Sequence, residues 1–156
     1  MKKHKRIALV AHDNRKPDLI EWVEWNWKTL SDHQIICTGT TGKLVEVALK
    51  KRATQGSQLK HKIKKLKSGP LGGDQQLGAL ITEGKVDMII FFWDPMQPQP
   101  HDVDVKALLR ITVLYNVPTA CNRSTADFLI SSLLFNEPYE RIIKDYSGYI
   151  NRKLKR

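Results

Sequence analysis

The stretch Arg6-Ile7-Ala8-Leu9-Val10-Ala11 is the clearest indicator of the fold, because its apolar residues follow one another without a polar interruption. A strand that is buried on one face alternates apolar and polar residues, whereas a continuous apolar run indicates burial on both faces. Residues 86–93 form a second run, apolar at every position except Asp87, which ends at Asp94-Pro95. Strands of this type belong to parallel sheets that helices cover on both sides.

The segments around these two runs alternate between helix and strand patterns. We expect strands at residues 34–37 and 118–121, and helices at residues 18–30, 43–52, 74–83, 102–116 and 124–134. Residues 50–67 are predicted to be an extended loop or a frayed helix, and the tail at residues 146–155 to be helical. The chain is therefore predicted to be a single α/β domain, residues 1–156, with a mostly parallel sheet.

Three local features accompany this prediction. Trp22 and Trp25 lie off the apolar stripe of the first helix, so they belong either to the core or to a subunit contact. Ser124-Thr125-Ala126-Asp127 is typical of a capping box. Cys37 and Cys121 are far apart and follow apolar runs, which favours buried, reduced thiols in a cytoplasmic protein.

The positive charge of the chain is concentrated in three segments. The formal net charge is +10, and residues 2–6, 50–67 and 152–156 hold four, eight and four basic residues. These 16 leave 10 basic residues against 16 acidic ones, so the rest of the chain carries −6. The three segments contain no aromatic residue, whereas nucleic-acid surfaces interleave the two types. We therefore interpret the excess as solvated charge and expect no nucleic-acid partner.

No segment predicts a membrane span or a secretion signal. The apolar run at residues 88–93 is far shorter than the roughly 20 residues that a bilayer requires. The basic start followed by residues 7–11 lacks a cleavage pattern. We therefore expect a cytoplasmic protein without a membrane partner.

Glycine and hydroxyl residues follow the strand at residues 34–37, where ligands bind in parallel sheets. Thr38-Gly39-Thr40-Thr41-Gly42-Lys43 provides main-chain N–H groups, hydroxyl donors and a helix start, which together suit a phosphate. Leu44 stands where a Walker A loop has Ser or Thr, which argues against a nucleoside triphosphate. A plain turn between a strand and a helix remains the alternative.

Ser68-Gly69-Pro70-Leu71-Gly72-Gly73-Asp74-Gln75-Gln76 combines three glycines and a proline with one carboxylate at a predicted helix start. The glycines allow sharp turns and a close approach to a ligand. Asp74 is therefore either a catalytic group or simply the N-cap of the helix.

Two histidine-containing segments also lie at strand ends. His12-Asp13 with Lys16 can bind a phosphate, or Asp13 can cap the next helix while Lys16 is solvated. His101-Asp102-Val103-Asp104 can transfer protons, or its acids can occupy a first helical turn. The histidines and cysteines show no metal-ligand spacing, so we predict a site without metal or cofactor.

Five motifs in one order give the chain a resemblance to the methylglyoxal synthase family, over about residues 6–149. They are Ala8-Leu9-Val10-Ala11-His12-Asp13, Thr38-Gly39-Thr40-Thr41-Gly42, the segment from Ser68 to Gln76, Phe91-Phe92-Trp93-Asp94-Pro95, and the segment from Pro100 to Arg110.

This resemblance implies a three-layer fold with a five-stranded sheet, and a carbon–oxygen lyase that converts dihydroxyacetone phosphate to methylglyoxal and inorganic phosphate. It also implies a homohexamer, inhibition by phosphate and no cofactor. Asp74 would be the catalytic base, with His101 and Asp104 assisting. The substrate would be bound by His12, Lys16, Thr38, Gly39, Thr40, Thr41, Ser68, Gly69 and His101.

Two departures and one alternative qualify the implied function. The segment between Gly42 and Ser68 is longer and richer in lysine than is typical of the family, and Lys153 stands where an arginine can reach the phosphate site of a neighbouring subunit. A non-catalytic domain that senses phosphate or a metabolite is the alternative, since folds do not fix function. Asp74 and His101 in one chain favour the enzyme.

Overall fold

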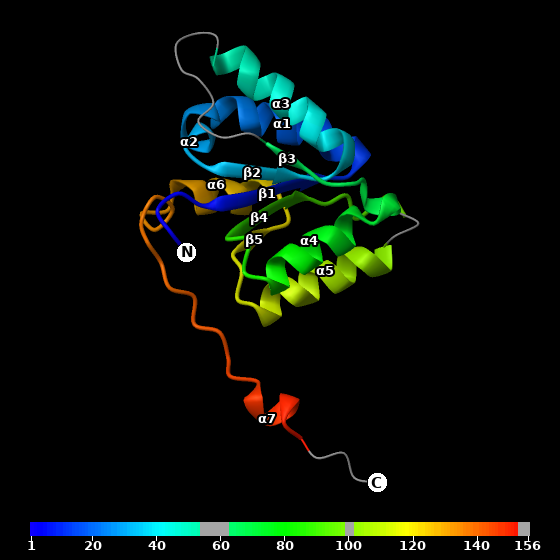
Figure 1. Ribbon diagram of the computed structural model, residues 1–156. Helices are drawn as coiled ribbons and strands as arrows, with labels where there is room; N and C mark the ends of the chain where they lie inside the picture. Colours follow the sequence, from blue (N-terminus) through cyan, green and yellow to red (C-terminus); the bar gives the residue numbers. More distant parts are fainter. Residues whose placement is uncertain (54–62, 99–101, 153–156) are drawn as a thin grey trace.

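Five parallel strands form the centre of the molecule, in the order β3-β2-β1-β4-β5 (Figure 1). The computed structural model describes residues 1–53, 63–98 and 102–152. The strands are β1 (Arg6–Ala11), β2 (Gln34–Cys37), β3 (Lys64–Lys65), β4 (Met88–Phe92) and β5 (Thr119–Ala120). The predicted α/β class with a five-stranded parallel sheet is therefore confirmed.

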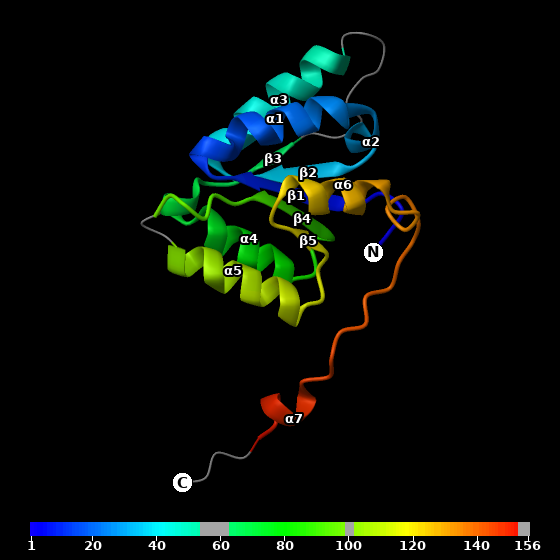
Figure 2. The same ribbon diagram turned by 180° about the vertical axis from the view of Figure 1, so that it is seen from behind.

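Helices cover both faces of this sheet, which gives three layers (Figures 1 and 2). The first face carries α1 (Lys16–Trp25), α2 (Trp27–Ser31), α3 (Gly39–Ala53) and α6 (Arg123–Ser131), and the second carries α4 (Gly73–Thr82) and α5 (Asp102–Leu114). Two short turns, η1 (Asp13–Arg15) and η2 (Gly69–Leu71), follow β1 and β3, and α7 (Ser147–Ile150) lies in the tail. Among the described residues, no helix has the length and apolar character of a membrane span.

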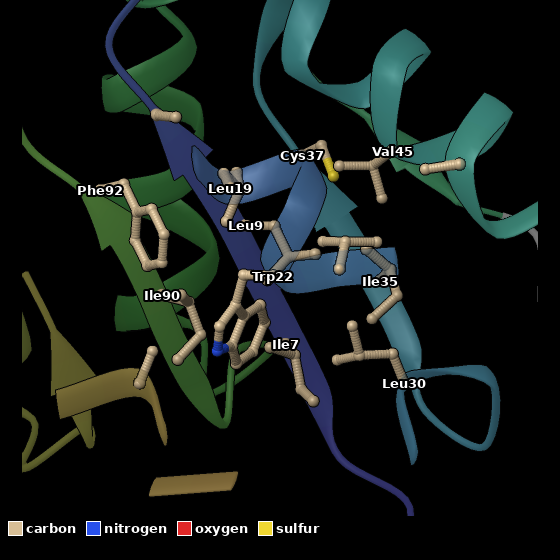
Figure 3. Packing of buried hydrophobic residues seen from close by; sticks show 14 of the residues in the cluster. Ile7, Leu9, Leu19, Trp22, Leu30, Ile35, Cys37, Val45, Ile90 and Phe92 are labelled. Carbon is tan, nitrogen blue, oxygen red and sulfur yellow. The ribbon is translucent and has the colours of Figure 1, made fainter. Parts of the chain in front are cut away.

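The central strand β1 supplies both cores because its side chains alternate between the faces. Ile7 and Leu9 pack with Trp22 of α1 on the first face (Figure 3). Ala8 and Val10 belong to the cluster on the second face, beneath α4 and α5. Burial on both sides explains why the strand has no polar position between residues 7 and 11.

The helix predicted at residues 18–30 is divided at Asn26 into α1 and α2. The Asn26 side-chain amide donates to the carbonyl oxygen of Trp22 at 2.9 Å, and such local bonds compete with a regular helix. Trp22 is 1% exposed, and its indole N–H donates to Asp127 of α6 at 2.8 Å, so it is a core residue. Trp25 is 84% exposed.

Three further details differ from the prediction. The N-cap of α6 is Asn122, whose side chain accepts from the Thr125 N–H at 2.9 Å, so the capping box at Ser124 is wrong. The short strand β3 was not predicted because Lys64 and Lys65 are exposed and polar. In the lysine-rich segment 50–67, α3 continues to Ala53, and residues 54–62 lie outside the described residues.

Cys37 and Cys121 are free thiols as expected, although Cys121 is only half-buried.

An ion pair between the half-buried Arg6 and the buried Asp87 joins the start of β1 to the turn before β4. The Arg6 side chain donates from Nε and Nη2 to the two Asp87 carboxylate oxygens, both at 2.9 Å, and the Arg6 main-chain N–H donates to the same group. Burial alone would raise the pKa of Asp87, but the bonds from Arg6 outweigh it and lower this pKa below the ordinary value. The lowered pKa means that the ionised carboxylate stabilises the fold.

We expect Asp87→Asn to lower the free energy of unfolding by about 2 kcal/mol at pH 7, because charge-assisted hydrogen bonds are lost. The pKa of Asp87 is lower in the folded protein than in the unfolded chain, where it is roughly 4. The stabilisation by the ionised carboxylate is therefore fully present above about pH 4, and it is lost as the pH falls through the pKa of the folded protein. Urea unfolding at pH 7 and at pH 3 measures this. A deficit of the same size at both pH values would contradict the role of the ionised carboxylate.

Candidate active site

A cavity of about 80 Å³ opens at the carboxyl ends of β1 and β2, beside the start of α4. Parallel sheets bind ligands at this edge. Nine of the residues that the sequence singled out line the cavity, and they come from three separate segments of the chain. They are His12, Lys16, Thr38, Gly39, Thr40, Thr41, Ser68, Gly69 and Asp74.

The first turn of α3 forms one wall of the cavity. The helix was predicted to begin at Lys43, but it begins at Gly39, so the threonines lie in the helix itself. The Gly39 N–H donates to the Lys67 carbonyl at 3.0 Å, while the N–H groups of Thr40 and Thr41 lie in the first turn, where an α-helix offers them no carbonyl acceptor. This arrangement and the helix dipole favour an anion at this wall.

Lys16 brings a positive charge to the same wall. Its ammonium group contacts the Asp13 carboxylate and the Thr40 hydroxyl. The hydrogen bond and the charge of Lys16 lower the pKa of Asp13 below its ordinary value. The alternative in which Asp13 caps a helix and Lys16 is solvated is therefore wrong: His12 and Arg15 occupy the two cap positions.

Asp74 lies at the start of α4 and is 5% exposed. The N-cap of α4 is Gly72, with φ 91°, so Asp74 belongs to the first turn and the N-cap alternative is wrong. Gly73 approaches the preceding loop closely, because a Cβ at this position would lie 2.1 Å from the Lys67 carbonyl oxygen. Two glycines are thus required to bring the carboxylate into the cavity.

His12 is buried at the end of β1, and its orientation depends on residues for which the sequence alone predicted no role. Its Nδ1 accepts from the main-chain N–H of Asp94 at 3.2 Å, and its ring meets Phe91 edge to face at 5.1 Å. Asp94 also accepts from the side chain of Asn14 at 3.1 Å. The available signal was the position of Asp94, two residues after the end of the buried strand β4.

The second predicted histidine segment is only partly described. His101 lies outside the described residues. Asp104 lies in the first turn of α5 and is not among the residues that line the cavity in the described part of the chain. The predicted roles of His101 and Asp104 stay predictions.

No group of three or more histidine, cysteine, aspartate or glutamate residues is placed to hold a metal within residues 1–53, 63–98 and 102–152. Among the residues that the structure describes, the polar groups that line the cavity are hydroxyls, main-chain N–H groups, one ammonium, one imidazole and the carboxylates of Asp13 and Asp74. Hydroxyl and cationic donors of this kind suit a phosphate. The prediction of a site without cofactor stays a prediction.

Comparison with known proteins identifies the family. The model of the MGS-like domain matches residues 18–121. A methylglyoxal synthase from Maridesulfovibrio salexigens is 59% identical and is aligned over 99% of this chain and 100% of its own length. The chain belongs to the methylglyoxal synthase family.

Further members of the methylglyoxal synthase family agree over nearly the whole chain. The protein of this name from Cellvibrio japonicus is 55% identical over 96% of this chain and 91% of its own length. The crystal structure of methylglyoxal synthase from Elizabethkingia anophelis NUHP1 is 47% identical, with a TM-score of 0.88, and covers 99% of this chain and 95% of its own. The resemblance seen in the motifs is therefore confirmed.

Proposed function

We propose that this protein converts dihydroxyacetone phosphate to methylglyoxal and inorganic phosphate, as a carbon–oxygen lyase without cofactor. One observation carries the proposal in a chain of this family: the cavity holds a buried carboxylate, Asp74, beside an anion-binding helix start and Lys16. A base and a phosphate site in one small cavity fit a short phosphorylated substrate.

The substrate phosphate binds at the first turn of α3. The N–H groups and hydroxyls of Thr40 and Thr41, together with Ser68 and Gly69 across the cavity, supply hydrogen bonds. Lys16 supplies the charge, because its ammonium already contacts the Thr40 hydroxyl.

Asp74 is the base in the first step. It removes a proton from the hydroxymethyl carbon, and the electron pair of the C–H bond forms an enediolate. An ionised carboxylate is a weak base, with an ordinary pKa of roughly 4, so donors at the substrate oxygens must stabilise the enediolate. His12, and His101 with Asp104, are the proposed groups.

The second step breaks the carbon–oxygen bond to phosphate. The enediolate electrons expel phosphate, which takes the proton of the remaining hydroxyl, and leave an enolate whose terminal carbon takes up a proton to give methylglyoxal. Expulsion requires that the breaking bond stand out of the enediolate plane, and a firmly held phosphate fixes this angle. The phosphate wall is thus as important as the base.

The proposal is tested by incubating the protein with dihydroxyacetone phosphate and measuring methylglyoxal and phosphate together. We expect both products in equal amounts. Binding of the substrate without any product would support the sensing domain instead.

We further propose a cytoplasmic homohexamer that inorganic phosphate inhibits. In support, the tail leaves the body of the molecule (Figure 1). It carries apolar residues with little cover, among them Ile142, which is 84% exposed, and Ile150, which is 75% exposed. Large exposed apolar side chains favour contacts between chains.

Arg152 lies over the Tyr149 ring at 4.0 Å, and Lys153 lies outside the described residues. Phosphate, as a product, fits the same wall as the substrate.

A further inference from the structure

Asn14 joins the loop after β1 to the loop after β4. Its side-chain amide donates to the Oδ2 atom of Asp94 at 3.1 Å and to the Oε1 atom of Gln97 at 2.7 Å. An ionised carboxylate only accepts hydrogen bonds, so the NH₂ end of the Asn14 amide must face Asp94. Both N–H bonds of the amide are used, one for each acceptor.

The carboxylate of Asp94 is held from two sides. Its Oδ1 atom accepts from the Met96 main-chain N–H at 3.0 Å, and its Oδ2 atom accepts from Asn14. These two hydrogen bonds lower the pKa of Asp94 below its ordinary value, which keeps the group ionised and able to accept both. The main chain of Asp94 is consequently fixed relative to η1.

The fixed main chain determines which nitrogen of His12 carries the proton. The Asp94 N–H donates to Nδ1 of His12, and a ring nitrogen that accepts a hydrogen bond carries no proton. In the neutral ring the proton is then on Nε2. His12 lines the cavity, so the ring presents a donor and not an acceptor through Nε2.

We propose that Asn14 is a positioning residue, which acts through Asp94 to hold His12 as the Nε2–H tautomer in the cavity. The inference rests on the proposed function for its kinetic consequence: an Nε2–H donor stabilises a developing negative charge on a substrate oxygen, whereas an unprotonated Nε2 repels it. A histidine with its ring rotated or its tautomer exchanged supports turnover poorly.

The test combines nitrogen NMR of the histidine rings with kinetics on the whole chain. In the wild type, the His12 signals, assigned with His12→Gln, should show an unprotonated, hydrogen-bonded Nδ1 and a protonated Nε2. In Asn14→Ala we expect the Nδ1 shift to leave the hydrogen-bonded value, and kcat for dihydroxyacetone phosphate to fall on the order of tenfold. The melting temperature should change little, since Asn14 is exposed.

Two further variants separate positioning from general damage. Gln97→Ala removes one acceptor of Asn14 but leaves the bond to Asp94, so it should keep the wild-type His12 signals. Asn14→Asp combined with Asp94→Asn restores one donor facing one acceptor, so it should recover the His12 signals that Asn14→Ala loses.

A wild-type His12 with a protonated Nδ1 would overturn the inference, and so would unchanged His12 signals and kcat in Asn14→Ala. If the wild type turns over no dihydroxyacetone phosphate, the proposed function fails, while the His12 signals in the variants still decide whether Asn14 positions the ring.

Discussion

Asp74→Asn is expected to lower the turnover of dihydroxyacetone phosphate by at least about 10²-fold, and as much as about 10⁴-fold, because the amide cannot accept the substrate proton. The side chain keeps its size, and the phosphate wall on α3 is untouched, so the substrate should still bind. The loss of turnover is measured as the rate of methylglyoxal formation. The retained substrate binding is measured by calorimetric titration with dihydroxyacetone phosphate, which is possible because the variant consumes little of the substrate.

Asp18→Asn is the matched control for this variant. Asp18 also lies in the first turn of a helix, α1, but it pairs with Arg15 and is not among the residues that line the cavity. It loses the same charge near a helix start, with a similar effect on the helix dipole. Retention of more than about a tenth of the wild-type turnover in Asp74→Asn would contradict its role as the base.

Gly73→Ala is expected to have the second largest effect, on stability and activity together. The added Cβ would lie 2.1 Å from the Lys67 carbonyl oxygen and 2.9 Å from the carbonyl carbon of Ser68, and main-chain atoms cannot move aside cheaply. Helix α4 must shift, which costs about 1–3 kcal/mol of unfolding free energy. A shift of about 1 Å in the base costs on the order of 10²-fold in rate. Urea unfolding and steady-state kinetics measure the two effects.

Gly78→Ala provides the control within the same helix. A Cβ there would meet Ile111 at 3.6 Å, an ordinary van der Waals contact. Alanine favours a helix over glycine by up to about 1 kcal/mol, so this variant should be as stable as the wild type or more stable. Equal behaviour of the two variants would show that the approach of Gly73 to Lys67 does not constrain α4.

The strands were predictable where burial left a continuous apolar run. Residues 7–11 and 88–92 are buried on both faces, so their sequence has no polar position to obscure the pattern. The strand β3 has no such signal, because Lys64 and Lys65 lie at the sheet edge with exposed side chains. Its pairing with Ile36 and Cys37 of β2 is a tertiary contact that local sequence does not express.

The helix starts were harder to predict for a related reason. Glycine and threonine have low helix propensity, yet α3 begins at Gly39 because the Gly39 N–H finds an acceptor in the loop after β3. Asn122 caps α6 two residues before the expected capping box, and both residues are good caps by composition.

The motifs contained most residues of the cavity, but they gave no role to the residues that orient His12: Asp94 lies in one motif without an assigned role, and Asn14 lies in none. Asn14 and Asp94 are 80 positions apart and meet because Ala11 pairs with Phe92 in adjacent strands. Only the register of β1 and β4 shows that they act on the same histidine.

The contact between the loops after β2 and β3 has a consequence for which substrates can react. The Gly39 N–H donates to the Lys67 carbonyl, and a Cβ on Gly39 would lie 2.8 Å from the Cβ of Ser68, so the two loops touch directly. The Gly73 N–H donates to the Ser68 carbonyl at 2.8 Å, which continues the connection to α4. The first turn of α3 and the start of α4, which carries Asp74, are therefore joined by direct main-chain contacts. We expect this connection to select phosphate esters by chain length, because it would bring only a carbon at one set distance from the phosphate to Asp74.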